Sequence, residues 1–99
     1  MEKQKAHYLL TDIKKLVDKG RVNATRTAID GAAQLGYSFD DMKEVVLNLE
    51  NGDLHKSMTT HKDHKVWQDV YIFPSEDVGD IYLKLSIVED VLIVSFKEK

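Results

Sequence analysis

The amino-acid sequence predicts an α+β fold in which N-terminal helices pack on an antiparallel β-sheet. In the first half of the chain the apolar residues recur every three to four positions, as on one face of a helix. After Gly52 they alternate with polar residues, as in β-strands. With 99 residues, 42% of them hydrophobic, and no cysteine, the chain fits one domain over residues 1–99 without disulfides or thiolate metal sites.

Three helices are expected in the first half of the chain. Thr11 suits the N-cap of a helix over residues 12–19, because its side-chain oxygen can accept a hydrogen bond from an unpaired backbone N–H. A second helix is expected over residues 25–35. The third begins at Ser38, where Ser-Phe-Asp-Asp resembles a capping box, and ends before residue 51.

Strands are expected where polar and apolar residues alternate in the second half. They cover residues 54–60, 66–73, 80–88 and 91–97, and a short edge strand at 8–10 would precede the first helix. Because an amphipathic sheet buries one face, the helices should cover its apolar side and leave the polar side open. The chain has no long apolar run, so we expect no signal peptide, no membrane span and a cytoplasmic protein.

The last two expected strands define the geometry of the open face. If residues 89–90 form a two-residue loop, counting outward from it places Tyr82 opposite Lys97. A phenol and an ammonium group would then lie side by side, and a β-bulge would break this register. The same register predicts a buried face made of Ile81, Leu83, Leu85, Ile87, Leu92, Val94 and Phe96.

A local basic segment interrupts a chain whose formal net charge is −3. Residues 55–65 hold three lysines against one aspartate, a net +2, whereas residues 76–90 hold five acids against one lysine, a net −4. This contrast indicates a defined anion site rather than a protein that coats nucleic acid. A three-residue loop at 61–63 would place Lys56 opposite Gln68, and other loop lengths are equally allowed.

Three literal motifs resemble the MqsR toxins: KSMTT at residues 56–60, WQDVY at 67–71 and the tail DVLIVSFKEK at 90–99. The similarity covers essentially the whole chain. It implies a RelE-like fold and the toxin of a type II toxin–antitoxin system, an mRNA interferase that cuts single-stranded RNA. Cleavage would need neither metal nor ribosome and would fall at a short GC-containing site. A zinc-containing antitoxin, MqsA, would inhibit it. The chain departs from the family pattern at residues 72–79 and in its negative charge.

The resemblance also assigns roles to individual residues. Those regarded as catalytic in the family fall on Lys56, Gln68 and Tyr82. Metal-free cleavage of RNA needs a base for the 2′-OH, positive charge at the phosphorane and an acid for the leaving 5′-oxygen, so no cofactor is expected. A second set is expected to contact RNA or its phosphates: Lys97, which matches in the tail, Lys84, and His64, the histidine closest in sequence to the WQDVY motif.

Other interpretations of these residues stay open at this point. The spacing of His55, His61 and His64 lacks the carboxylate pattern of common zinc sites, so no metal is expected. Residues 32–46 look like a helix-turn-helix, but the reading helix is acidic and no DNA binding is expected. Trp67 is expected in the core, on the helix-facing side. The rival functions are a catalytically inactive RelE-like module that binds an antitoxin or another protein, and an RNA binder that does not cleave.

Overall fold

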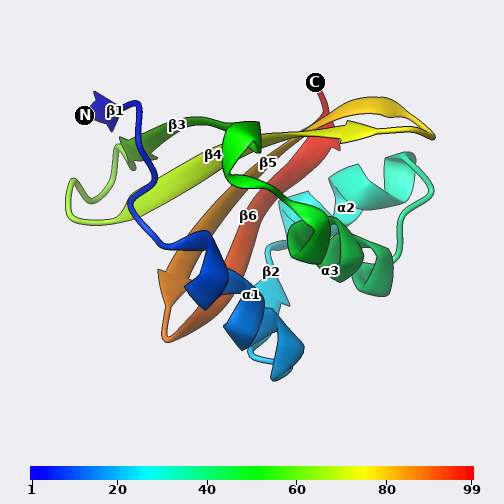
Figure 1. Cartoon of the computed structure of the whole chain (residues 1–99), viewed down its shortest axis with the longest axis horizontal. Helices are drawn as coiled ribbons and strands as arrows, with labels where there is room; N and C mark the ends of the chain where they lie inside the picture. Colours follow the sequence, from blue (N-terminus) through cyan, green and yellow to red (C-terminus); the bar gives the residue numbers. More distant parts are fainter.

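Three helices cover one face of a curled six-stranded β-sheet in the computed structural model, which describes residues 1–99 (Figure 1). This arrangement confirms the predicted α+β class. The longest helix has ten residues, and none is long and apolar enough to cross a membrane. The helices are α1 (Leu10–Asp18), α2 (Arg26–Gln34), α3 (Phe39–Asn48) and the short 3₁₀ helix η1 (Asn51–Asp53). The strands are β1 (Glu2–Lys3), β2 (Val22–Ala24), β3 (Leu54–Thr59), β4 (Trp67–Ser75), β5 (Gly79–Val88) and β6 (Asp90–Glu98).

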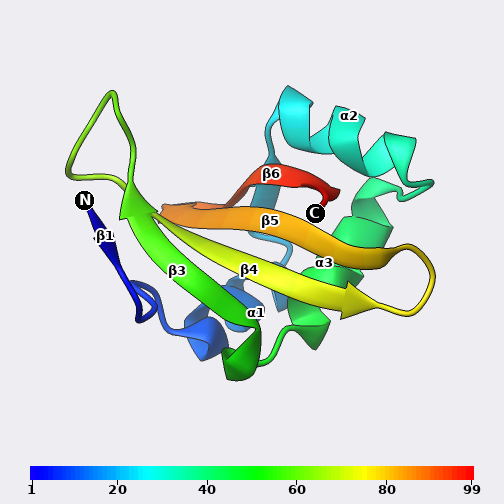
Figure 2. The same cartoon turned by 90° about the horizontal axis from the view of Figure 1, so that it is seen from above.

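The strands follow the order β1-β3-β4-β5-β6-β2 across the sheet (Figure 2). The long strands β3 to β6 form an antiparallel meander, and each lies within two residues of its predicted bounds. At the edges, β1 pairs antiparallel with β3 and β2 pairs parallel with β6. Neither edge strand was predicted, because strands of two or three residues are too short to show alternation. The strand predicted at 8–10 is wrong, since Leu10 already belongs to α1.

Side-chain caps determine where α2 and α3 begin. Thr25 caps α2, and Ser38 begins α3 with a reciprocal capping box, so both predicted starts are confirmed. The predicted cap at Thr11 is wrong. Helix α1 begins at Leu10, with Leu9 at the N-cap position and no side-chain hydrogen bond there. Because Leu10 is part of the hydrophobic core, packing rather than capping determines this start.

The core lies between the helices and the inner face of the sheet, where 17 buried residues form one hydrophobic cluster. Helix α2 packs closely on β6, because Ala28 and Ala32 are fully buried and Gly31 lies against the main chain of the strand. A side chain at position 31 would overlap the carbonyl oxygen of Phe96, so this contact requires glycine. No helix covers the opposite face, which is called the open face below.

The β5–β6 hairpin contains a tighter turn than predicted and a β-bulge. Val88 pairs with Asp90, which leaves Glu89 alone at the turn with a φ of 67°. The predicted two-residue loop is therefore wrong. Farther along the hairpin the register shifts once, and Val94 has no partner on β5. The two irregularities displace the register in opposite senses, so the predicted pairing is restored beyond the bulge.

Between the turn and the bulge, the two faces of β6 are exchanged relative to the prediction. A register change of one residue moves each side chain to the other face of a strand. Val91 and Ile93 are fully buried, whereas Leu92 and Val94, which were predicted to be buried, remain partly exposed. The prediction for those two residues is therefore wrong, and the cause is a bulge that local alternation does not reveal.

Candidate functional site

The open face places Tyr82 of β5 opposite Lys97 of β6, as predicted. The Nζ atom of Lys97 lies 5.5 Å from the centroid of the Tyr82 ring, and the Nζ atom of Lys84 lies 5.9 Å from the same centroid. At these distances the ring attracts both ammonium groups. On the other side Tyr82 pairs with Ile72 of β4, so an apolar side chain flanks the phenol there.

Lys56 and Gln68 also lie on the open face, although not opposite each other. The β3–β4 loop is longer than the predicted three residues, so Lys56 pairs with Val70 and Gln68 pairs with Met58. The predicted Lys56–Gln68 pair is wrong, but a shift of two residues leaves both side chains on the predicted face. Val70 pairs on its other side with Lys84. Lys56 and Lys84 therefore belong to one row across the sheet, about 10 Å apart at Cα.

Gln68 and His64 lie farther from the phenol. Gln68 is four residues along β4 from Ile72, the neighbour of Tyr82, and this corresponds to roughly 14 Å along the strand. His64 lies in the exposed loop that joins β3 to β4, beyond the last paired residues of the two strands. The structure thus places Gln68 at the edge of the site and leaves His64 outside it. The residues that it gathers, called the cationic cluster below, are Lys56, Tyr82, Lys84 and Lys97.

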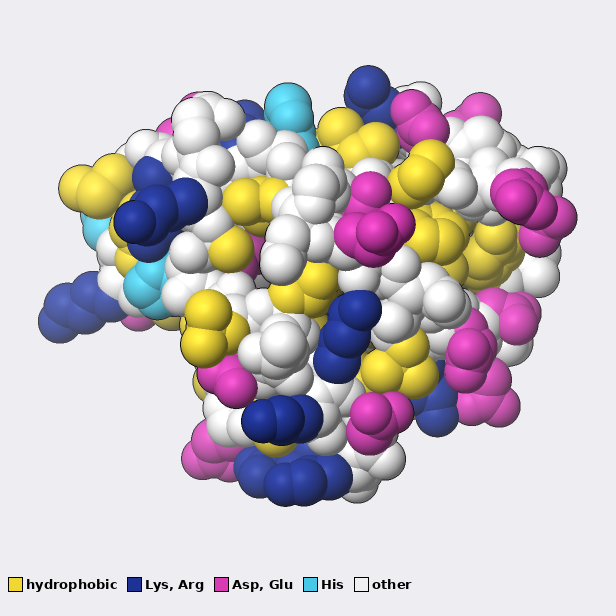
Figure 3. All heavy atoms as spheres, viewed as in Figure 1, with side chains coloured by type: hydrophobic (Ala, Val, Ile, Leu, Met, Phe, Trp, Pro, Cys, Tyr) yellow, Lys and Arg dark blue, Asp and Glu magenta, His cyan; other side chains and the backbone are white.

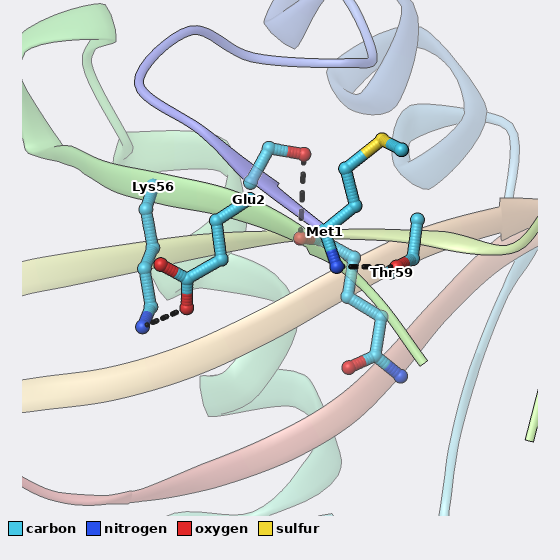
Figure 4. A network of polar contacts seen from close by, with 6 residues as sticks. Met1, Glu2, Lys56 and Thr59 are labelled. Atoms are coloured by element: carbon cyan, nitrogen blue, oxygen red, sulfur yellow. Dashed lines mark hydrogen bonds and ion pairs between the residues drawn. The ribbon is translucent and has the colours of Figure 1, made fainter. Parts of the chain in front are cut away.

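The ammonium group of Lys56 is paired with a carboxylate that the sequence did not point to. Its Nζ atom lies 2.8 Å from Oε1 of Glu2 in β1 (Figure 4). This hydrogen bond raises the pKa of Lys56 and lowers the pKa of Glu2, so both groups stay charged at neutral pH. The two residues are 54 positions apart, and no local pattern connects them.

Trp67 lies at the start of β4 and points to the helix-facing side, as predicted, but it is not a core residue. The ring of His7 stacks on it with centroids 5.1 Å apart, and the Nζ atom of Lys3 lies 4.1 Å from the indole centroid. The chain ahead of α1 therefore covers the indole in place of the helices. The prediction of a core tryptophan is wrong for this reason.

A polar groove of about 330 Å³ opens beside the cationic cluster, between α2 and β6. Thr27, Gln34, Ser95 and Lys97 are among the residues that line it, so Lys97 belongs both to the cluster and to the groove. No group of three or more His, Cys, Asp or Glu residues lies close enough together to hold a metal ion. The hydrogen-bonding groups of the site are those of lysine, tyrosine, serine, threonine and amide side chains, together with the carboxylates of Glu2 and Asp30.

Acidic side chains gather on other parts of the surface. Figure 3 shows them over α3 and the loop between β4 and β5, while several lysines and arginines lie over α1. The first turn of α3 contains Asp40 and Asp41, and this helix packs on the inner face of the sheet. A negative net charge is therefore compatible with a cationic open face.

The family described as motility quorum-sensing regulator, toxin of MqsA, matches residues 5–98 of the chain. The chain belongs to the MqsR toxin family. A relative from Escherichia coli (strain K12), named mRNA interferase toxin MqsR, is 50% identical over 99 residues, which is 100% of both chains. This match confirms the resemblance carried by the KSMTT, WQDVY and DVLIVSFKEK motifs. In this member of the MqsR family, those motifs contribute residues to β3, β4 and β6.

Proposed function

We propose that this MqsR-family chain cuts single-stranded mRNA across the open face of its sheet, without metal ion or ribosome, as the toxin of a toxin–antitoxin pair. Family membership makes it an endoribonuclease toxin. The observation that supports the site is the closeness of the Tyr82 ring to the ammonium groups of both Lys84 and Lys97, with Lys56 on the same face. The cluster combines a group that can exchange a proton with positive charges held on a sheet, as metal-free cleavage requires.

In the proposed reaction the ribose 2′-OH attacks the neighbouring phosphorus atom and the bond to the 5′-oxygen breaks. The products are a 2′,3′-cyclic phosphate and a free 5′-hydroxyl. Tyr82 takes part in proton transfer at this centre. Lys84 and Lys97 stabilise the additional negative charge of the pentavalent intermediate, and losing one such contact typically costs about 10²–10³ in rate. Lys56 binds the same phosphate or the adjacent one.

Sequence preference is assigned to the edges of the cationic cluster. The amide of Gln68 offers a donor and an acceptor and lies far enough from Tyr82 to contact the base of a neighbouring nucleotide. Ile72 and the groove beside Lys97 flank the phenol on its two sides. We assign the proposed preference for a short GC-containing site to these three features.

The proposed partners are mRNA and an antitoxin. The family description names MqsA as the partner of its toxins, and we propose a zinc-containing antitoxin of this kind for the present chain, acting in the cytoplasm. The chain would act as a single RelE-like domain over residues 1–99. DNA binding is left to the antitoxin, because the acidic first turn of α3, at Asp40 and Asp41, repels phosphate.

The proposal is tested with purified protein and an end-labelled single-stranded RNA, with and without EDTA. Cleavage should be equal in both, and 2′-deoxy substitution at the scissile nucleotide should abolish it. Tyr82→Phe and Lys56→Ala should slow cleavage at least 100-fold. Lys62→Ala, in the exposed β3–β4 loop, is the matched control and should cleave normally. RNA that stays intact, or cleavage that EDTA stops, would overturn the proposal.

A further inference from the structure

We propose that Glu2 is a positioning residue that competes with the RNA phosphate for the ammonium group of Lys56 and thereby weakens RNA binding. The inference rests on the proposed function, since it concerns a lysine of the same cluster. It adds a residue from the N-terminal edge strand to a site otherwise built from the four long strands. RNA must displace the Glu2 carboxylate before a phosphate can reach Lys56.

The register of β1 on β3 brings the carboxylate to the lysine. Glu2 pairs with Met58, and Met58 lies on the open face two residues along β3 from Lys56. Glu2 and Lys56 are thus diagonal neighbours on one face of two adjacent strands, within reach of a long side chain. Figure 4 shows the Glu2 carboxylate directed at the Lys56 ammonium group, and their separation is 2.8 Å.

A buried carboxylate holds the N-terminal segment in this position. Asp69 of β4 is fully buried and accepts hydrogen bonds from the backbone N–H groups of His7 and Tyr8, at 3.0 and 2.9 Å. It also accepts one from the hydroxyl of Ser57 in β3, at 2.6 Å. These bonds tie the chain that follows β1 to both strands of the hairpin. Glu2 is therefore delivered by an anchored segment and not by a loose end.

The ion pair is accessible enough for a phosphate to replace the carboxylate. The Lys56 side chain is 26% exposed and that of Glu2 is 52% exposed. Ion pairs exposed to this extent contribute little to stability, because water screens them. An RNA phosphate can therefore take the place of Glu2 while the rest of β1 stays on the sheet.

The competition has a measurable signature in salt dependence. Salt screens the attraction between the Glu2 carboxylate and the Lys56 ammonium group, so the carboxylate competes less well with a phosphate as the salt concentration rises. The gain in RNA affinity on removing the Glu2 charge should therefore be largest at low salt and shrink at high salt. Log K should consequently fall more steeply with log salt once the Glu2 charge is removed.

The experiment compares the wild type with Glu2→Gln, which keeps the shape of the side chain and removes its charge. Binding of an RNA made uncleavable by 2′-O-methyl groups is measured by fluorescence anisotropy over a range of salt concentrations. Glu2→Gln should bind RNA about two- to fivefold tighter at low salt, and its log K should fall more steeply with log salt than that of the wild type. In cleavage assays KM should fall by the same factor while kcat stays unchanged.

Two control variants separate the inference from simpler explanations. Glu44→Gln changes the net charge equally on exposed α3, across the sheet from the open face, and should leave affinity and slope as in the wild type. In a Lys56→Gln background, Glu2→Gln should have no effect on either quantity. A variant in which β1 came away from the sheet would also uncover Lys56, so tighter binding is expected in that case too.

Unchanged or weaker RNA binding by Glu2→Gln would overturn the inference, because a carboxylate that merely supports Lys56 would strengthen binding. An equal gain from Glu44→Gln would also overturn it, since the effect would then be one of net charge. Failure of the proposed function looks different. In that case Lys56→Gln alone would leave both RNA binding and cleavage as in the wild type.

Discussion

Replacing Gly31 by alanine tests how closely α2 packs on the sheet. The structure predicts that this change destabilises the protein, whereas the helix propensities predict that it stabilises it. In an isolated helix, the change from glycine to alanine stabilises by about 1 kcal/mol. Here the added methyl group would overlap the carbonyl oxygen of Phe96. That oxygen belongs to β6, which is paired with β5 on one side and β2 on the other, and cannot rotate away as a side chain would, so α2 must move instead.

The magnitude follows from what that movement disturbs. Ala28 and Ala32, on the same face of α2 as Gly31, are both fully buried and would lose packing if the helix moved. Overpacking typically costs 1–3 kcal/mol, and we take about 3 kcal/mol because the overlap is with main chain. The better helix propensity of alanine offsets about 1 kcal/mol of this cost, so the expected net loss of stability is about 2 kcal/mol. For a chain of this size it corresponds to a fall in Tm of about 10 °C.

Urea unfolding followed by circular dichroism measures this difference directly. Gly52→Ala is the matched control, because a methyl group there meets nothing within 4 Å and the residue lies in η1. The control should change the free energy of unfolding by no more than about 1 kcal/mol, in the stabilising direction. If Gly31→Ala proved as stable as the wild type or more stable, the close approach of α2 to β6 would be wrong, and with it the position of Lys97 beside α2.

Three further perturbations test the buried groups and the site. Burial raises the pKa of Tyr71 to about 12, so its contribution to stability is complete below its unfolded pKa of about 10 and is lost as the pH rises to about 12. As the pH rises from about 10 to about 12, the free energy of unfolding of Tyr71→Phe should therefore fall by up to about 3 kcal/mol less than that of the wild type, as measured by urea unfolding. Asp69→Asn points an amide N–H at a backbone N–H donor and should lower the free energy of unfolding by about 2–4 kcal/mol in the same assay. An unchanged urea midpoint would contradict the role of Asp69 in holding the N-terminal segment. Expression of the wild type should arrest growth, and Tyr82→Phe should relieve the arrest with an unchanged circular dichroism spectrum, whereas a Tyr82→Phe variant that stayed toxic would refute the site.

The sequence by itself determined the elements whose signals are local. The caps at Thr25 and Ser38, and the alternation along β3 to β6, depend on residues a few positions apart, and a single chain displays such spacings directly. Alternation also determined which side chains of β3 and β4 share the open face, because a shift of two residues in the β3–β4 hairpin preserves the face. The KSMTT, WQDVY and DVLIVSFKEK motifs supplied the family, and the family supplied the candidate residues.

The tertiary structure alone decided the features that join distant segments. The edge strands β1 and β2 are too short to show a period, and they exist because longer strands offer unpaired N–H and C=O groups. The bulge at Val94 moved two side chains to the other face, and Asp69 anchored the segment that brings Glu2 to Lys56. Such contacts depend on side-chain packing and hydrogen bonding between strands far apart in the chain. For that reason the pairing of Glu2 with Lys56, across 54 residues, leaves no trace in the local sequence.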